Sequence, residues 1–175
     1  AFFDYICVGE GDYLISDLIK CNFNVHSFSE IAGLVYRNAD GKVVSNGMGV
    51  TADLDKLPLP AYAHYPMPLS FYTPAVNNYK RLPTTAVMAS RGCPSTCTYC
   101  QSALFKKNVR YFSVEYVIKH LKFLIENYGI KEIAFFDDIF TIKRSRIIEI
   151  CDRMIEERLN LTWICFIKAN RIITK

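Results

Sequence analysis

The stretch Thr84–Cys100, TTAVMASRGCPSTCTYC, runs from an apolar segment directly into three closely spaced cysteines. Residues 84–89 have the β-branched and apolar composition of a buried strand. Cys93, Cys97 and Cys100 follow with only small or polar residues and a proline between them, which suits a tight loop. The sequence therefore predicts a strand whose carboxyl end delivers a metal-binding loop, at the edge where barrel-type α/β folds place their chemistry.

Three thiolates in this spacing are suited to soft metal centres. They are one ligand short of a structural zinc site, which normally takes four protein ligands, so they favour an iron–sulfur cluster or a metal with an open position. An alternative stays open, in which a zinc or structural loop takes its fourth ligand from Cys151, Cys165 or a histidine.

The CxxxCxxC pattern, with Tyr99 before its last cysteine, resembles that of the radical S-adenosylmethionine (SAM) superfamily. The resemblance implies that Cys93, Cys97 and Cys100 bind a 4Fe-4S cluster through three irons, and that SAM chelates the fourth. It also implies that SAM is cleaved reductively to methionine and a 5'-deoxyadenosyl radical. Tyr99 would then pack near the adenine of SAM.

From residue 84 onward, strands and helices alternate along the sequence. Strands are predicted at 84–89, 131–136 and 161–167, and helices at about 114–128 and 143–159. This order is typical of parallel βαβ units, and with the resemblance it predicts an α/β fold containing the first three βα units of a partial (β/α)6 TIM-type barrel. His120 lies off the apolar stripe of the first helix, so we expect it to be solvated rather than a ligand.

Polar residues follow the second and third of these strands. Asp137 and Asp138 resemble the acidic motif that meets the methionyl amino group of SAM in this superfamily, while a competing interpretation makes Asp138 or Thr141 a helix cap. Because side chains alternate along a strand, one of the two carboxylates should point inward and the other outward. After the third strand, the resemblance implies that Lys168 or Arg171 holds the carboxylate or ribose of SAM.

The amino-terminal segment reads as strand, glycine turn and helix. The strand is predicted at 2–8 and the helix at 13–19, and the strand is expected to need partners from outside this sequence. Between them lie Gly9, Glu10 and Gly11, which by themselves most often only permit a sharp turn. A hairpin is predicted where 33–38 and 43–46 flank an Asp-Gly pair.

In this order, the GEGD turn, the hairpin and the DLDKLPLPAY stretch resemble the junction between the cobalamin-binding domain and the radical core of cobalamin-type radical SAM enzymes. The resemblance implies a Rossmann-like cobalamin-binding domain of which this chain carries the last strand and helix, with Gly9, Glu10 and Gly11 near the cobalamin. None of the three histidines lies in the family's usual cobalamin-ligand motif. The chain is accordingly expected to be a fragment.

Residues 57–83 hold six of the seven prolines and show no sustained periodicity, which indicates an extended connection. Its aromatic residues either anchor it to its neighbours, the favoured interpretation, or line a substrate entrance. The expected domains are residues 1–22, the end of the cobalamin domain; 23–83, a hairpin and linker; and 84–175, the incomplete radical SAM core.

Composition narrows the function classes. The net charge of +4 comes from scattered basic residues, so no nucleic-acid surface is expected. The seven cysteines are an odd set, three of them clustered in a ligand loop rather than spread as a disulfide framework, which favours a reducing compartment, the cytoplasm by default. No apolar run is long enough to predict a membrane span.

The sequence and the resemblance together predict an enzyme that uses a 4Fe-4S cluster, SAM and cobalamin. The reaction would be a methylation, cyclisation or rearrangement of a small-molecule or natural-product substrate, with a one-electron reductant such as flavodoxin or ferredoxin. Two alternatives remain, a radical SAM protein that does not use cobalamin and an iron–sulfur or zinc module without SAM cleavage.

Overall fold

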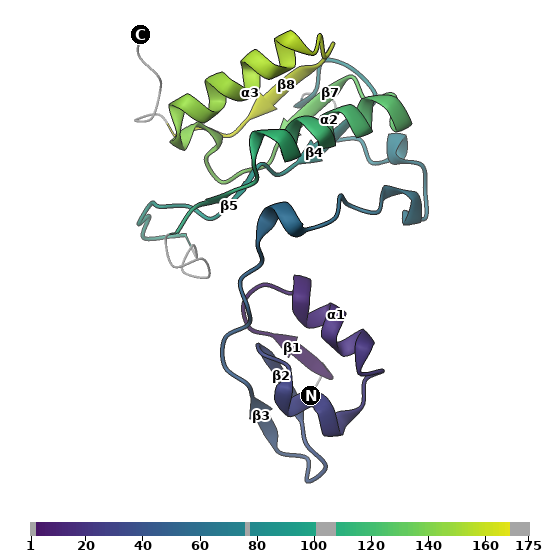
Figure 1. The fold of residues 1–175 in the computed structure, drawn as a ribbon, viewed down its shortest axis with the longest axis vertical. Helices are drawn as coiled ribbons and strands as arrows, with labels where there is room; N and C mark the ends of the chain where they lie inside the picture. The colour runs from purple at the N-terminus through teal and green to yellow at the C-terminus, as the bar shows by residue number, and fades with distance from the viewer. Residues whose placement is uncertain (1–2, 76–77, 101–107, 169–175) are drawn as a thin grey trace. The chain divides into compact units, whose positions relative to one another are not determined.

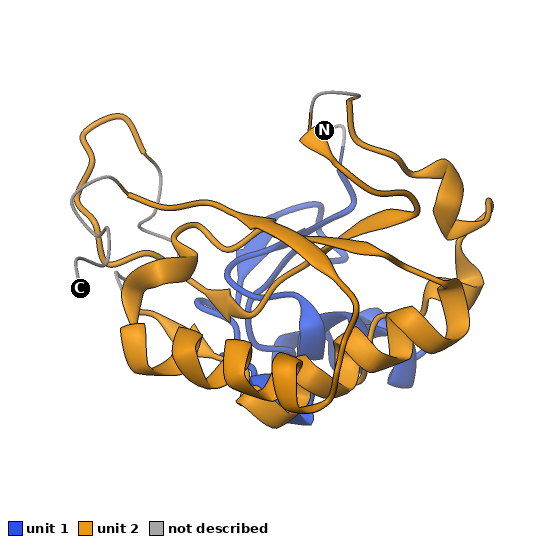
Figure 2. Ribbon diagram, turned by 90° about the horizontal axis from the view of Figure 1, so that it is seen from above, with its two compact units in different colours: residues 1–57 blue, residues 58–175 orange. Residues whose placement is uncertain are grey.

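The computed structural model describes residues 3–75, 78–100 and 108–168 (Figure 1). The chain divides into two compact units, Ala1–Leu57 and Pro58–Lys175 (Figure 2). This division falls within residues 23–83, where the sequence predicts a hairpin followed by a linker. Each unit has its own sheet and its own buried side chains.

The first unit contains a three-stranded antiparallel sheet in the order β1-β2-β3. Its elements are β1 (Tyr5–Cys7), α1 (Asp12–Lys20), the 3-10 helix η1 (Val25–Glu30), β2 (Leu34–Arg37), β3 (Val43–Ser45) and the 3-10 turn η2 (Leu54–Lys56). Tyr5 pairs with Tyr36, which pairs in turn with Val44. The expectation that the first strand lacks a partner in this sequence is therefore wrong, because the predicted hairpin supplies one.

One face of this sheet is covered by α1 and η1. The buried cluster contains Leu14 and Leu18 from the helix, together with Phe28, Leu34 and Tyr36. On the opposite face, a small groove of about 100 Å³ is lined by other strand residues, including Ile6, Val35 and Val43. The covered and open faces follow the alternation of side chains along the strands.

The connection at the start of the second unit folds into short 3-10 turns, η3 (Tyr62–His64) and η4 (Leu69–Phe71). Tyr62 is buried, and its hydroxyl lies 2.9 Å from Nε2 of His120. Its ring also lies against the rings of Phe123 and Tyr128. For Tyr62, the interpretation as an anchor is therefore the one that its contacts support.

The second unit is built on three parallel strands in the order β4-β7-β8. They are β4 (Thr84–Val87), β7 (Glu132–Phe135) and β8 (Thr162–Cys165), and the helices between them are α2 (Val114–Tyr128) and α3 (Arg144–Glu156). The two helices lie side by side along one face of the sheet (Figures 1 and 2). The predicted α/β class with parallel strands is confirmed, while closure into a barrel stays a prediction.

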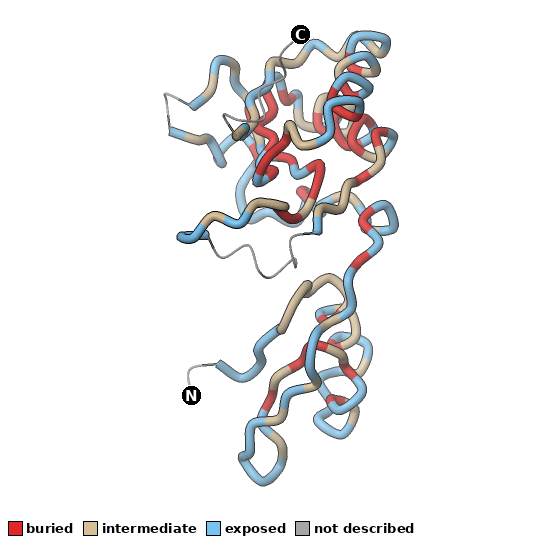
Figure 3. The backbone as a smooth tube through the Cα atoms, turned by 90° about the vertical axis from the view of Figure 1, so that its left-hand side faces the viewer, coloured by how far each residue is buried: buried red, intermediate tan, exposed pale blue. Residues whose placement is uncertain are grey.

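Helix α2 begins and ends at the residues that the sequence indicates. The Ser113 hydroxyl accepts a hydrogen bond from the Tyr116 N–H at 3.1 Å, and Gly129 adopts a left-handed conformation at φ 63°. Val117, Leu121 and Leu124 are fully buried. Figure 3 shows buried segments in both units in red. Capping and apolar spacing thus fix this helix locally.

The structure corrects the expectation for His120. Its side chain is 4% exposed, because Tyr62 of the connection covers a second side of α2 beyond the apolar stripe. A sequence pattern within one helix does not reveal what a distant segment covers. His120 is a hydrogen-bonded core residue.

Exposed apolar side chains lie at or just beyond the carboxyl ends of the three parallel strands. Met88, Phe136 and Phe166 are each about half exposed, and Ile164 is 41% exposed. Within the described residues, no helix is long and apolar enough to cross a membrane.

Candidate metal and cofactor site

The cysteine loop is carried by a short hairpin at the carboxyl end of β4. Strand β5 (Ser90–Arg91) leads into the loop and β6 (Arg110–Tyr111) leaves it, and the two pair antiparallel. Cys93 is buried, Cys97 is half-buried and Cys100 is exposed. The predicted order of strand, loop and cysteines is thus present.

The three thiols share one loop but do not converge. In residues 3–75, 78–100 and 108–168, no three His, Cys, Asp or Glu side chains are grouped as ligands of one ion. The donor set nevertheless fits an iron–sulfur cluster, because cysteine thiolates are its usual ligands. Ligand loops commonly take their final arrangement only around the metal, so Cys93, Cys97 and Cys100 remain the predicted ligands.

Tyr99, in the same loop, is 90% exposed. An aromatic ring left in water can gain apolar contact area when a ligand packs on it. Its position next to Cys100 keeps it close to the predicted metal site.

The two aspartates after β7 differ sharply in environment. Asp137 is 1% exposed and Asp138 is exposed, so one carboxylate is enclosed and the other is not, although both residues lie beyond the end of the strand. The carboxylate of Asp137 accepts hydrogen bonds from the Ser90 hydroxyl and, at 3.2 Å, from the Ala89 N–H. Burial raises the pKa of Asp137, although these hydrogen bonds and the nearby charge of Arg146 oppose the shift.

The competing interpretation of this segment as a helix cap is wrong for α3. Its N-cap residue is Lys143, and no side chain caps the helix by a hydrogen bond. The Thr141 hydroxyl is buried, and among the described residues it has no hydrogen-bond partner. Asp138 precedes the intervening 3-10 turn η7 (Phe140–Ile142), which also has no side-chain cap.

Lys168 lies beside the cysteine loop. Its Nζ atom is 3.2 Å from the hydroxyl of Ser95, which stands between Cys93 and Cys97. Residues that follow the first and third parallel strands therefore meet at one edge of the sheet. Arg171, the other predicted SAM contact, lies outside the described residues.

Arg146, on α3, is a buried residue near this edge that the sequence analysis did not single out. It is 7% exposed, and its Nη2 atom donates to the carbonyl oxygens of Ala89 at 3.1 Å and Phe112 at 2.7 Å. One sequence signal could have found it, because Arg146 lies four residues before the buried Ile150. A charged residue at an inward position of an amphipathic helix indicates a buried partner.

The glycine turn of the first unit packs against that unit itself. Gly9 has φ 107°, and a Cβ atom there would lie 3.1 Å from Sδ of Met48. The Glu10 carboxylate accepts a hydrogen bond from the Ala52 N–H at 3.0 Å, and Gly11 precedes α1 as its N-cap residue. These contacts give the turn a packing role.

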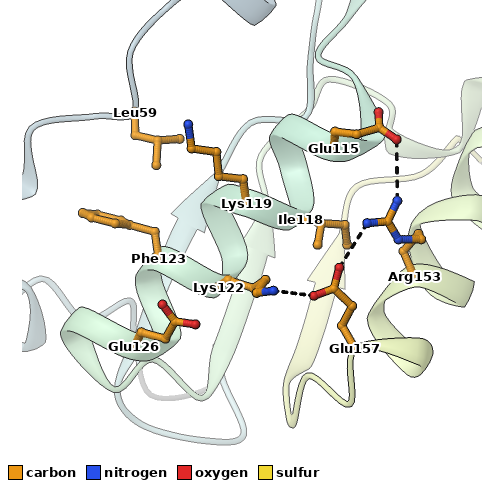
Figure 4. Close-up of a pocket in the computed structure, with 9 residues that line it drawn as sticks. All are labelled: Leu59, Glu115, Ile118, Lys119, Lys122, Phe123, Glu126, Arg153 and Glu157. Atoms are coloured by element: carbon orange, nitrogen blue, oxygen red, sulfur yellow. Dashed lines mark hydrogen bonds and ion pairs between the residues drawn. The ribbon is translucent and has the colours of Figure 1, made fainter.

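A separate groove of about 410 Å³ lies on the outer side of α2 and α3 (Figure 4). Its wall carries a chain of ion pairs, in which Glu157 lies 2.6 Å from Lys122 and 3.0 Å from Arg153, and Glu115 lies 3.6 Å from Arg153. Its lining includes none of the predicted site residues.

Fold and site together define an α/β protein with a three-cysteine loop at the carboxyl ends of parallel strands. No protein-family model matches the chain. It is 36% identical over 171 residues to an uncharacterized methyltransferase of Pyrococcus horikoshii. The aligned region covers 95% of this chain and 35% of that protein. The chain thus spans about a third of the length of this relative.

Further curated relatives have named activities. An anaerobic magnesium-protoporphyrin IX monomethyl ester cyclase of Rubrivivax gelatinosus is 26% identical over 91% of this chain and 28% of its own length. A cytidylyl-2-hydroxyethylphosphonate methyltransferase of Streptomyces wedmorensis is 28% identical over 79% of this chain and 30% of its own.

Solved structures share the fold of this chain. The apo form of OxsB, a cobalamin-dependent SAM radical enzyme, superposes with a TM-score of 0.72 at 24% identity, over 95% of this chain and 23% of that one. OxsB with aqua-cobalamin and SAM bound gives a TM-score of 0.67, over 91% of this chain and 22% of the OxsB chain. The chain thus shares its fold with part of this cobalamin-dependent SAM radical enzyme, and it is similar in sequence to curated methyltransferases and to a cyclase.

Proposed function

We propose that this protein is a radical SAM enzyme of the cobalamin-dependent type. Cys93, Cys97 and Cys100 would hold a 4Fe-4S cluster, which supplies the electron for reductive cleavage of SAM. The observation that carries the proposal is the cysteine loop at the carboxyl end of β4, with Lys168 from beyond β8 at 3.2 Å from Ser95 inside it. The methyltransferase and cyclase names of the relatives agree with it.

The chain's own residues would bind and orient SAM at this edge. Asp138 is the carboxylate that we assign to the methionyl ammonium, since Asp137 is enclosed and already accepts hydrogen bonds from Ser90 and Ala89. Lys168 carries a cation that suits the carboxylate of SAM or its ribose oxygens. The exposed ring of Tyr99 suits contact with adenine.

We propose cobalamin as the further cofactor, supported by the family relationship and by the bound cofactor named for OxsB. The residues that the resemblance places near it, Gly9, Glu10 and Gly11, pack within the first unit, so no step of the reaction is assigned to them. Binding of aqua-cobalamin by the purified protein, followed by its visible absorbance, tests this part.

The substrate class that we propose is a small molecule, methylated or cyclised, as the names of the relatives suggest. A one-electron protein reductant would deliver the electron to the cluster. The residues around the cysteine loop would serve the cofactor side of the reaction.

Anaerobic reconstitution tests the proposal. The wild-type protein should take up about four iron and four sulfide per chain and form 5'-deoxyadenosine from SAM when reduced. Cys97→Ala should abolish both, while Cys151→Ala, a matched change on α3 outside the loop, should leave both in place. Stoichiometric zinc uptake without SAM cleavage would instead support the module alternative.

A further inference from the structure

The hairpin stem that carries the cysteine loop is held from outside the hairpin at both of its ends. Ala89 immediately precedes β5, and Phe112 immediately follows β6. Their backbones are hydrogen-bonded to each other, from the Phe112 N–H to the Ala89 carbonyl at 3.1 Å. Cys93, Cys97 and Cys100 all lie between these two residues in the sequence.

Arg146 binds the junction from α3. A single guanidinium nitrogen donates to the Ala89 carbonyl at 3.1 Å and to the Phe112 carbonyl at 2.7 Å. The guanidinium carbon also lies 5.2 Å from the centre of the Tyr111 ring, on β6. The same side chain thus contacts the residue before the stem, the residue after it and one of its strands.

Asp137 binds the opposite side of the same junction. It accepts hydrogen bonds from the N–H of Ala89 and the hydroxyl of Ser90. Ala89 is therefore held through its N–H by an acid after β7 and through its carbonyl by a base on α3. Ala89 is fully buried, and Ser90, Asp137 and Arg146 are all less than 8% exposed.

A buried charge is costly unless hydrogen bonds and an opposite charge offset that cost. Apolar side chains would join α3 to the sheet without this cost, as Ile147 and Ile150 already do. Two buried charges at one junction therefore indicate a requirement for directional contacts. Directional contacts fix the orientation of the stem, and thereby the place of Cys93, three residues after Ser90.

We propose that Arg146 is a positioning residue for the cysteine loop, and that its bonds to the Ala89 and Phe112 carbonyls set where Cys93 enters the metal site. The metal site itself rests on the proposed function. The position of the loop in the metal-free protein does not depend on the proposed function, so it can be tested separately.

The test measures how fast each cysteine of the metal-free protein reacts with N-ethylmaleimide, with peptide mass spectrometry resolving the sites. Cys93 is 8% exposed, so its labelling requires local opening of the stem. Arg146→Met removes both hydrogen bonds and should speed labelling of Cys93 about tenfold, with exposed Cys100 unchanged. Arg146→Lys keeps the positive charge, and its rate of Cys93 labelling should lie between those of Arg146→Met and the wild type.

Arg153→Met is the matched control. Arg153 lies on the same helix, two turns later, and binds Glu115 and Glu157 at the surface. This variant should label Cys93 at the wild-type rate. After reconstitution, iron per chain should fall in Arg146→Met, recover partly in Arg146→Lys and remain at the wild-type level in Arg153→Met.

Arg146→Met could label Cys93 at the same rate as the wild type and differ only in a lower melting temperature. That result would show that Arg146 stabilises the fold without positioning the loop. Failure of both Arg146 variants to fold would also overturn the proposal, because the residue would then be needed for the whole unit. If the wild-type protein takes up no cluster, the proposed function fails, while the labelling comparison still decides the role of Arg146.

Discussion

The hydroxyl of Ser90 donates a hydrogen bond to the carboxylate of Asp137, which joins the start of the cysteine hairpin to the end of the neighbouring strand. The two residues are 47 positions apart in the sequence. Both are buried, so neither polar group can turn to water. The bond belongs to the tertiary structure, and its loss should be measurable.

Ser90→Ala should lower the free energy of unfolding by about 1–3 kcal/mol, because it leaves a buried carboxylate short of a donor. Urea denaturation followed by circular dichroism measures the change. Ser145→Ala, at an exposed position of α3, is the matched control and should change stability by less than about 0.5 kcal/mol. Equal stability of the two variants would contradict the importance of the bond.

Asp137→Asn and Asp138→Asn should separate folding from cofactor binding. Asp137→Asn places an amide N–H₂ opposite the N–H of Ala89 and the hydroxyl of Ser90, which are themselves donors. It should therefore destabilise the protein by about 1–3 kcal/mol. Asp138→Asn should leave stability within about 0.5 kcal/mol of the wild type and raise the KM for SAM. Thermal melts and SAM-dependent kinetics measure the two effects. A wild-type KM in Asp138→Asn would reject its assignment to SAM.

Glu132 anchors the other end of β7. Its buried carboxylate accepts hydrogen bonds from the backbone N–H groups of Lys80 and Arg81 and from the Thr162 hydroxyl. Burial alone would raise the pKa of Glu132, but these bonds outweigh it and hold the pKa below its usual value. A lowered folded pKa stabilises the protein above the ordinary glutamate range, and this stabilisation disappears as the pH falls through the folded pKa.

Glu132→Gln should therefore lower stability at pH 7 by about 1–3 kcal/mol and lose part of the acid dependence of the wild type. Denaturation at a series of pH values from 7 to 3 provides the measurement. Glu126→Gln, on the outer groove wall, serves as the comparison. An unchanged pH profile in Glu132→Gln would show that other carboxylates dominate acid unfolding.

His120 gives the protein a second acid-sensitive position. Burial lowers the pKa of His120 from 6.5 to about 4. As the pH is lowered, the unfolded chain therefore binds a proton at a higher pH than the folded one. The free energy of unfolding falls as the pH drops from about 6.5 towards 4, by about 3 kcal/mol in total. His120→Gln should remove this slope, while His64→Gln, at an exposed position, should retain it. Parallel pH profiles for His120→Gln and the wild type would contradict the assignment.

The local features of the fold were predictable because local chemistry determines them. Ser113 and Gly129 bound α2, and the alternation of strands and helices after residue 84 matches β4, α2, β7, α3 and β8 to within a few residues. The pairing of β1 with β2 was missed because strand pairing depends on two segments about 30 residues apart, which no local pattern links.

The sequence by itself determined the cysteine loop and its place after the first parallel strand, because the type and spacing of these ligands depend only on consecutive residues. Only the tertiary structure decided that Asp137 faces Ser90 while Asp138 stays exposed, that His120 is covered by Tyr62, and that Arg146 reaches the hairpin stem. Burial and hydrogen bonding between distant segments depend on packing, and packing is a property of the folded chain.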